Sequence, residues 1–482
     1  MRGKSYLAAL LFSVVMIPKS KAQTTSLKLP QAEGVSSLQN PLEESSSSSK
    51  PMQVYGQIRV ENMQYLTPIP EQPGLTYSQL LSARLSLLKE TSILDFAADA
   101  SGGTFFSKGQ SHTMVHEAYM SSRGLGNLKI SLGRKKKEWS EVDHRWNLGL
   151  WQPVYSIDAL RPEEEGLAGL FIDYNTQGWE ILAFGTTFNI PNMGPDIRED
   201  NGGLAADSRW YRPPSRDYDF NSNINTISYK LDIPDQLDLV KNGGGAMMGR
   251  IGNKESGPWI VVSGGYLPVN ELILKRAAYK NISADKVDVT VTPEVTYHRI
   301  GSMDLGYTFG SLKASISYLA DDPKEIRPDG DLSIQKLKPL QAYSAAIDFS
   351  MANILVRPIT VQFEYLKVVG GGIQDITANG TPDSFTMFDS RLKFTDAVQV
   401  KLEGQVATFF RRPFVTRFKY LYDYDQRGSL LNTEFLYYPH QKWAVVAGAD
   451  VLGVQDENYD KSGFLNEFRA NDRVYGGMTY VF

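Results

Sequence analysis

The sequence predicts an all-β protein, a transmembrane antiparallel β-barrel of about 18 strands, with roughly 16 to 20 allowed and an even number expected. Two observations lead to this prediction. Segments throughout the chain alternate apolar and polar residues with period two, and no segment after an N-terminal apolar run approaches the ~20 continuous apolar residues of a membrane-spanning helix. Because only alternate residues of a barrel strand face lipid, a β-barrel can span a membrane although the overall hydropathy of the chain is low.

The N-terminal segment is predicted to direct export. Residues 1–22 carry basic residues, then the apolar run 6–17, then an imperfect cleavage site that ends at Ala22, in the pattern of a secretory signal peptide. Residues 23–50 are polar and end in a serine run, a composition that cannot bury enough apolar surface to fold. We therefore expect a disordered periplasmic tether at 23–50 and a barrel over 51–482.

Composition excludes several classes of protein and site. The chain has no cysteine, so disulfides and thiolate metal sites are excluded. Without residues 1–22, the chain keeps 46 basic residues against 54 acidic ones, a net charge near −8. An acidic excess argues against a nucleic-acid partner, which usually requires a basic patch.

The alternating segments carry charged residues on their polar face. From residue 52 to 61 and from 397 to 406, Val, Ile and Leu side chains oppose Gln, Lys, Arg and Glu. A soluble β-sandwich also alternates, but it has less need of so many charges opposite its apolar face. A water-filled lumen would favour them. The side chains predicted to face the lumen are Arg59, Lys401, Glu403, Arg417 and Lys419.

The candidate strands follow one another along the mature chain. They lie near 52–61, 78–88, 92–100, 112–121, 127–134, 166–175, 178–188, 220–230, 258–267, 287–297, 303–309, 312–319, 341–350, 356–368, 384–394, 397–409, 414–424, 429–438, 442–452 and 473–482. Strict alternation of short turns with long loops fails between 352 and 428. Segment 232–257 predicts a short helix and a glycine-rich flexible link, with a plug as the alternative.

Long segments between strands predict extracellular loops at 62–77, 101–111, 135–165, 189–219, 268–286, 369–383 and 453–470. The loop after the fifth strand holds Trp139, Trp146 and Trp151 and charges of both signs. Because exposed loops rarely carry three tryptophans, we expect this loop to pack on the inner wall and narrow a pore, with a loop clasping the rim as the alternative. The predicted constriction residues are Arg134, Lys135, Lys136, Lys137, Asp143, Arg145, Asp158 and Arg161.

The few histidines offer little catalytic chemistry. His112 and His116 lie in strand-like sequence, where four residues span roughly 13 Å, so the two side chains cannot share a metal ion. His144 lies near Ser140 and Asp143, but clustering in sequence does not supply the convergence that a nucleophile and base need. We expect no catalytic residue, no metal site and no cofactor.

The C-terminal strand carries a family resemblance. Tyr475, Gly477, Tyr480 and Phe482 resemble the C-terminal assembly signal of Gram-negative outer-membrane β-barrels. The tryptophan-rich loop resembles the inward-folded third extracellular loop of porins, and its Gly133-Arg134 start is also similar to alginate-export-type barrels. The resemblance to porins covers the chain from about residue 51.

This resemblance implies an outer-membrane channel for passive diffusion of small hydrophilic solutes or ions, not an enzyme. The implied partners are outer-membrane lipid and lipopolysaccharide, the barrel-assembly machinery and the permeating solutes. Such barrels often form homotrimers, although nothing in the sequence marks an interface. Two alternatives remain open, namely a structural or adhesin barrel with a closed lumen and an outer-membrane hydrolase built on a barrel wall.

Overall fold

The computed structural model describes residues 51–482 with the exception of 70, 71, 73, 108, 221–222, 282–285, 329, 331, 352–358, 384–390, 457 and 460–461. The predicted signal peptide and tether lie outside the described residues.

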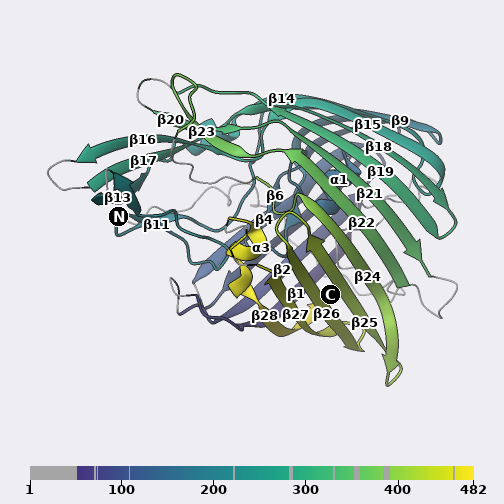
Figure 1. Ribbon diagram of the computed structural model, residues 1–482. Helices are drawn as coiled ribbons and strands as arrows, with labels where there is room; N and C mark the ends of the chain where they lie inside the picture. Colours follow the sequence, from purple (N-terminus) through teal and green to yellow (C-terminus); the bar gives the residue numbers. More distant parts are fainter. Residues whose placement is uncertain are drawn as a thin grey trace. The chain divides into compact units, whose positions relative to one another are not determined.

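Eighteen antiparallel strands close into a barrel, as the sequence predicts (Figure 1). In order around the wall they are β1 (Gln53–Tyr65), β2 (Tyr77–Glu90), β3 (Leu94–Phe105), β4 (Gln110–Ser122), β5 (Leu128–Lys135), β8 (Leu167–Asn175), β9 (Trp179–Thr186), β14 (Gly244–Asn253), β15 (Ser256–Pro268), β18 (Tyr297–Phe309), β19 (Leu312–Pro323), β21 (Leu340–Ser350), β22 (Ile359–Gly370), β24 (Asp396–Phe409), β25 (Arg412–Asp423), β26 (Gly428–His440), β27 (Trp443–Val454) and β28 (Arg473–Val481).

The C-terminal strand closes the barrel. β28 pairs with β27 on one side and with β1 on the other. Beyond the last strand residue, the N–H and carbonyl of Phe482 exchange hydrogen bonds of 2.9 and 3.0 Å with Gly56. Closure leaves no unpaired wall edge, which is the condition for a sheet to lie in lipid.

The predicted alternation of the wall residues is confirmed. Val60, Ile316 and Met478 are about half exposed on the outer face. Inward neighbours such as Glu61, Ser317 and Thr479 are buried. The inner face is therefore polar and the outer face apolar, as expected from the period-two pattern.

Connections lie alternately at the two ends of the barrel, and the longest ones all lie at one end. One end carries the links 91–93, 123–127, 176–178, 254–255, 310–311, 351–358, 410–411 and 441–442, and the other end carries 66–76, 106–109, 136–166, 187–243, 269–296, 324–339, 371–395, 424–427 and 455–472. The expected long loop at 101–111 is wrong, because β3 and β4 extend to within four residues of each other.

Short turns and long loops failed to alternate between 352 and 428 in the sequence analysis because a wall strand was predicted at 384–394. Residues 391–394 are not in a strand, and 384–390 lie outside the described residues. Leu392 and Phe394 alternate because both pack against the buried cluster inside the barrel. The described wall strands are joined by connections that alternate between the two ends of the barrel.

Two other predicted strands form but do not belong to the wall. The segments near 220–230 and 287–297 lie in a second, six-stranded sheet built from loops. Its strands in order are β12 (Asp217–Phe220), β13 (Asn223–Leu231), β17 (Lys286–Glu294), β16 (Ile273–Asn281), β20 (Ser333–Leu337) and β23 (Ile373–Thr377). Their alternation serves a separate small core that includes Ile227, Tyr229 and Val291.

The flexible link expected after the helix in 232–257 is wrong. The helix forms as α2 (Gln236–Val240), but the glycine-rich stretch is wall strand β14. Its Met247 and Ile251 face outward and are 62% and 66% exposed, while Ala246 and Met248 are buried. The outward positions of β14 alternate between glycine and a large apolar residue. The glycines made this strand look like a flexible link in the sequence.

The remaining elements lie in loops. They are the hairpins β6 (Val154–Tyr155) with β7 (Glu163–Glu164) and β10 (Arg198–Asp200) with β11 (Gly203–Ala205), helices α1 (Glu141–Trp146) and α3 (Phe464–Glu467), and the 3-10 helix η1 (Arg469–Asn471). Within the described residues, no helix is long and apolar enough to cross a membrane.

We predict that Gly56→Ala will weaken the closed barrel. A Cβ at Gly56 would lie 2.2 Å from Cζ of Phe482, so the C-terminal ring must move, at a cost of about 1–3 kcal/mol. Heat-modifiable mobility on gels should report a lower melting temperature. Gly249→Ala is the matched control, because a Cβ there meets nothing within 4 Å. Equal melting temperatures for the two variants would contradict the prediction.

Candidate functional site

The loop 136–166 leaves the wall after β5 and folds into the lumen. α1 lies within the ring of wall strands (Figure 1), and its neighbours are the inward faces of β18, β19 and β21. The N–H of Glu141 donates to Asp304 at 3.0 Å, and the indole of Trp146 donates to Ser344 at 3.3 Å. The predicted inward-folded loop is thus confirmed.

A buried carboxylate shapes the turn after α1. Both oxygens of Asp143 accept backbone N–H groups, from Leu150 and Trp151, at 2.9 Å each. Asn147 ends the helix in the left-handed conformation with φ of 49°. Burial raises the pKa of Asp143 to about 7 despite these two donors. The chain is turned back on itself so that Trp151 meets Trp139.

The tryptophans attach the loop to one side of the wall. The Trp139 and Trp151 rings stack with centroids 5.2 Å apart, and Phe184 of β9 packs edge-on at 6.1 Å. Hydroxyls of Ser263 and Ser302 donate to the Trp139 carbonyl at 2.7 and 3.1 Å. The loop packs into a buried cluster that extends along the inner wall from β8 to β27.

Arg145 joins the loop to the wall by charge. Its guanidinium makes two hydrogen bonds to Asp348, at 2.7 and 3.0 Å, one to Glu364 at 3.1 Å and one to Glu141 at 2.8 Å. Glu141 in turn accepts from Lys254 and Lys313. Arg145, Glu141 and Glu364 are at most 10% exposed, so loss of any one of them would leave a buried charge without its partner.

The far end of the loop reaches β1 and β28. Asp158 pairs with Arg473 at 2.7 Å, and Arg161 pairs with Glu61 at 2.8 Å while lying over the Tyr475 ring. The loop therefore spans the lumen between these strands and those that contact Trp139.

One histidine joins α1 to the returning strand β7 of the same loop. Nδ1 of His144 lies 2.8 Å from the Glu164 carboxylate, which also accepts from Gln152. Burial alone would lower the pKa of His144, but the Glu164 carboxylate and its hydrogen bond outweigh burial and raise the pKa to about 9. The pair is therefore charged at neutral pH.

The other predicted constriction residues lie at the base of the loop. Arg134 pairs with Glu165 and donates to the Gly166 carbonyl at 3.0 Å. Lys135 lies over the rings of Tyr119 and Phe171. The Lys136 N–H donates to Glu117 at 2.8 Å, and Lys137 pairs with Asp173 and Glu180. The eight residues are thus distributed along the whole loop.

The predicted lumen residues face inward and most belong to one chain of charges. Arg59 pairs with Glu434 at 3.1 Å, Glu434 with Arg417 at 2.7 Å, and Arg417 with Glu403 at 3.0 Å. Lys401 lies 3.4 Å from Glu364. Lys419 points inward, because its neighbours Phe418 and Tyr420 are exposed on the outer face.

Sequence reasoning missed the carboxylates that complete these pairs. Glu61, Asp348, Glu364 and Glu434 occupy polar positions of alternating strands, which is the available signal. Strand alternation identifies an inward face but not which distant strand supplies a partner.

The structure also places one serine beside a histidine. Ser101 Oγ lies 2.9 Å from Nε2 of His116, and Glu163 lies 3.2 Å from the same nitrogen. Nδ1 of His116 is buried and has no hydrogen-bond partner, so no third group orients the ring. Ser140, Asp143 and His144 do not converge, since His144 binds Glu164 and Asp143 binds backbone.

Among the described residues, no group of three or more His, Asp or Glu side chains could hold a metal ion.

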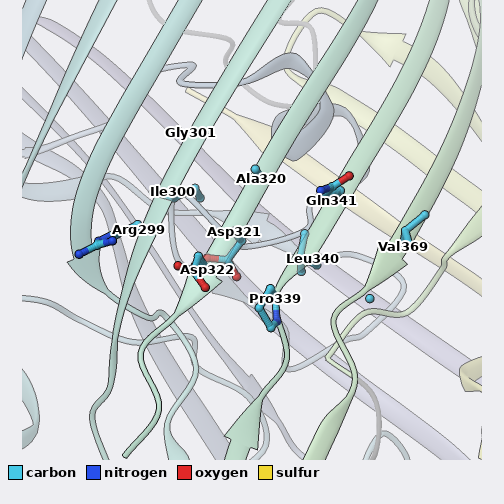
Figure 2. A pocket seen from close by; sticks show the side chains of 11 residues that line it. Arg299, Ile300, Gly301, Ala320, Asp321, Asp322, Pro339, Leu340, Gln341 and Val369 are labelled. Carbon is cyan, nitrogen blue, oxygen red and sulfur yellow. The ribbon is translucent and has the colours of Figure 1, made fainter.

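A pocket of ≈ 620 Å³ lies between the loop ends of β18, β19, β21 and β22 (Figure 2). Arg299, Ala320 and Asp322 line it from outward-facing positions, so it is a depression of the outer wall and not part of the lumen.

Comparison with known proteins gives distant structural likenesses. No family model matches the chain, and no curated protein matches it. OpdQ of Pseudomonas aeruginosa is 11% identical with a TM-score of 0.44, over 90% of this chain and 98% of that one. OccAB4 of Acinetobacter baumannii is 10% identical with the same score and coverage. OmpT, an outer membrane protein of Vibrio cholerae in trimer form, is 10% identical with a TM-score of 0.39, over 90% and 99%.

We predict that Arg145→Gln will release the loop. The change leaves three carboxylates without their shared cation, which should cost about 3–5 kcal/mol of docking free energy. Limited proteolysis should then cut within 136–166 while the wall resists. Arg198→Gln is the control, because Arg198 and Asp207 form an ion pair that is about half exposed. Equal resistance of both variants would contradict the role of Arg145.

We predict that loop docking will weaken at alkaline pH through His144. Because the folded pKa lies above the usual 6.5, the His144–Glu164 contribution is fully present below about pH 6.5 and is lost as pH rises through about 9. Tryptophan fluorescence during heating at pH 6.5 and 9.5 should show earlier undocking at the higher pH. His144→Gln should reduce that difference, and His440→Gln should not. An unchanged pH difference in His144→Gln would refute the assignment.

Proposed function

We propose that this protein is an outer-membrane channel for the passive diffusion of small hydrophilic solutes or ions, and that the loop 136–166 narrows its pore. One observation carries the proposal. The loop packs against the inner wall from β8 to β22, while charged side chains on the inward faces of β1, β2 and β24 remain partly exposed to water.

Exposure of inward-facing charges supports a water-filled passage. Glu163 on the loop and Glu403 on β24 have side chains that are 44% and 38% exposed, and Arg84 of β2 is 26% exposed. Charges of both signs line this side, which suits hydrophilic solutes and not apolar ones. No reaction chemistry is required of these side chains.

The outer face supports a membrane location. Large apolar side chains cover it, and in water so wide an apolar surface would drive association. Aromatic side chains occur at both ends, with Trp179, Trp443 and Phe309 beside the short turns and Tyr266 and Tyr424 toward the long loops. Two aromatic girdles around an apolar band are typical of outer-membrane barrels.

Two parts of the proposal follow from the sequence together with this geometry. Export by a cleaved signal peptide fits a barrel that must reach the outer membrane. Assembly through Tyr475, Gly477, Tyr480 and Phe482 fits the position of β28 as the strand that closes the wall. Lipid, lipopolysaccharide and the assembly machinery are the corresponding partners, with a homotrimer as a candidate assembly.

The test uses the absence of cysteine from the chain. We predict that Glu403→Cys and Glu163→Cys will give channels in planar bilayers whose conductance falls when a charged thiol reagent is added, because both positions border the passage. Asp238→Cys is the control, since Asp238 is exposed on α2 in a long loop. It should react without a change in conductance.

Two outcomes would count against the proposal. Folded wild-type protein without conductance would favour the structural barrel with a closed lumen. Conductance that does not respond to modification of either lumen cysteine would place the passage elsewhere.

A further inference from the structure

The segment 204–212 enters the mouth of the barrel beside β1 and β28. It belongs to the connection between β9 and β14, and β9 is six strand positions from β1 around the wall. Leu204, Ala206 and Tyr211 pack into the small core of the second sheet. Arg209 and Trp210, which lie between Ala206 and Tyr211, meet β1, β28 and their loops.

Arg209 fixes the segment beside β1 and β28. Its guanidinium is fully buried and donates to the carbonyls of Thr67, Leu75 and Ala470 and to the Asn471 side chain, at 2.7, 2.7 and 3.1 Å for Thr67, Leu75 and Asn471. The Asn471 amide donates back to the Arg209 carbonyl at 2.8 Å. One side chain thus joins three loops.

These contacts lie inside the mouth and not over its rim. Arg209 stacks on the ring of Tyr65, an inward residue of β1, at 4.3 Å. The indole of Trp210 lies 5.8 Å from the guanidinium of Arg473, an inward residue of β28. Since both partners face the lumen, the segment that touches them lies within the ring of strands.

An aromatic cluster extends this cover across the mouth. Trp210 packs on Phe464 and Phe468, at 6.3 and 5.5 Å between centroids, and Phe464 packs on Phe394 at 5.7 Å. Lys393, next to Phe394, donates to the Ala159 carbonyl of the inward loop at 2.9 Å. The cluster therefore contacts the inward loop from above, on the side of the lumen where the proposed passage lies.

We propose that residues 204–212, held by Arg209, form a second constriction at the loop end of the channel and set the largest solute that enters. The inference rests on the proposed channel function. It differs from the role of 136–166, because the two segments are held by different side chains and can be released separately.

The test compares variants on both sides of the contact. Arg209→Ala and Asn471→Ala remove the hydrogen bonds from opposite partners, and Trp210→Ala removes the ring while leaving those bonds in place. Each should raise single-channel conductance in planar bilayers. In liposome swelling assays each should shift the exclusion limit to larger sugars. Lys241→Ala, at an exposed position of the same connection but outside 204–212, should leave both readings unchanged.

The outcomes separate the inference from the channel function. Wild-type protein that does not conduct would overturn the channel function. Conducting variants with heat-modifiable barrels and unchanged conductance and exclusion limit would overturn only the second constriction. If Arg209→Ala does not assemble, Asn471→Ala and Trp210→Ala decide the result, because each leaves the other contacts of the segment intact.

Discussion

The closed ladder of backbone hydrogen bonds is the constraint on which the rest of the structure depends. Every wall strand has two neighbours because β28 pairs with β1, and the last bonds of that seam are between Phe482 and Gly56. An open edge would leave N–H and carbonyl groups unpaired in a lipid environment, at several kilocalories per mole each. The small residue at 56 is part of this solution, because the terminal ring occupies the space of its missing side chain.

A closed wall creates a second physical problem, which is the filling of its interior. Here the loop is attached to the inner wall by apolar contact, through stacked Trp139 and Trp151, and is oriented by buried charge, through Arg145 and its three carboxylates. Apolar packing alone would tolerate several loop positions. Ion pairs with Asp348 and Glu364 select one, because any other position leaves a buried charge without its partner.

The mouth repeats this combination with different residues. Trp210 supplies apolar contact with Phe464 and Phe468, and Arg209 supplies directional hydrogen bonds to two other loops. Each long connection therefore has its own attachment to the inside of the barrel. The two segments also share one contact, because Arg473 pairs with Asp158 of the inward loop and lies near the ring of Trp210.

The sequence by itself determined the barrel and the inward loop and bounded the strand number at about 16 to 20, because a strand's period-two pattern and a loop's unusual tryptophans are local properties. It also identified Arg59, Lys401, Glu403 and Arg417 as inward-facing, since register in a half-apolar strand decides the side. It misassigned β13, β17 and 391–394, where alternation served other buried surfaces.

Only the tertiary structure decided which charges meet. Arg145 reaches Asp348 across 203 positions of sequence and Arg161 reaches Glu61 across 100. Arg209 reaches Asn471 across 262. No pattern along one strand encodes such partners, because pairing across a lumen depends on how many strands close the wall and where each loop descends. Local periodicity in the sequence therefore predicts the barrel wall, whereas the charge pairs of the site form only when the barrel closes and brings distant residues together.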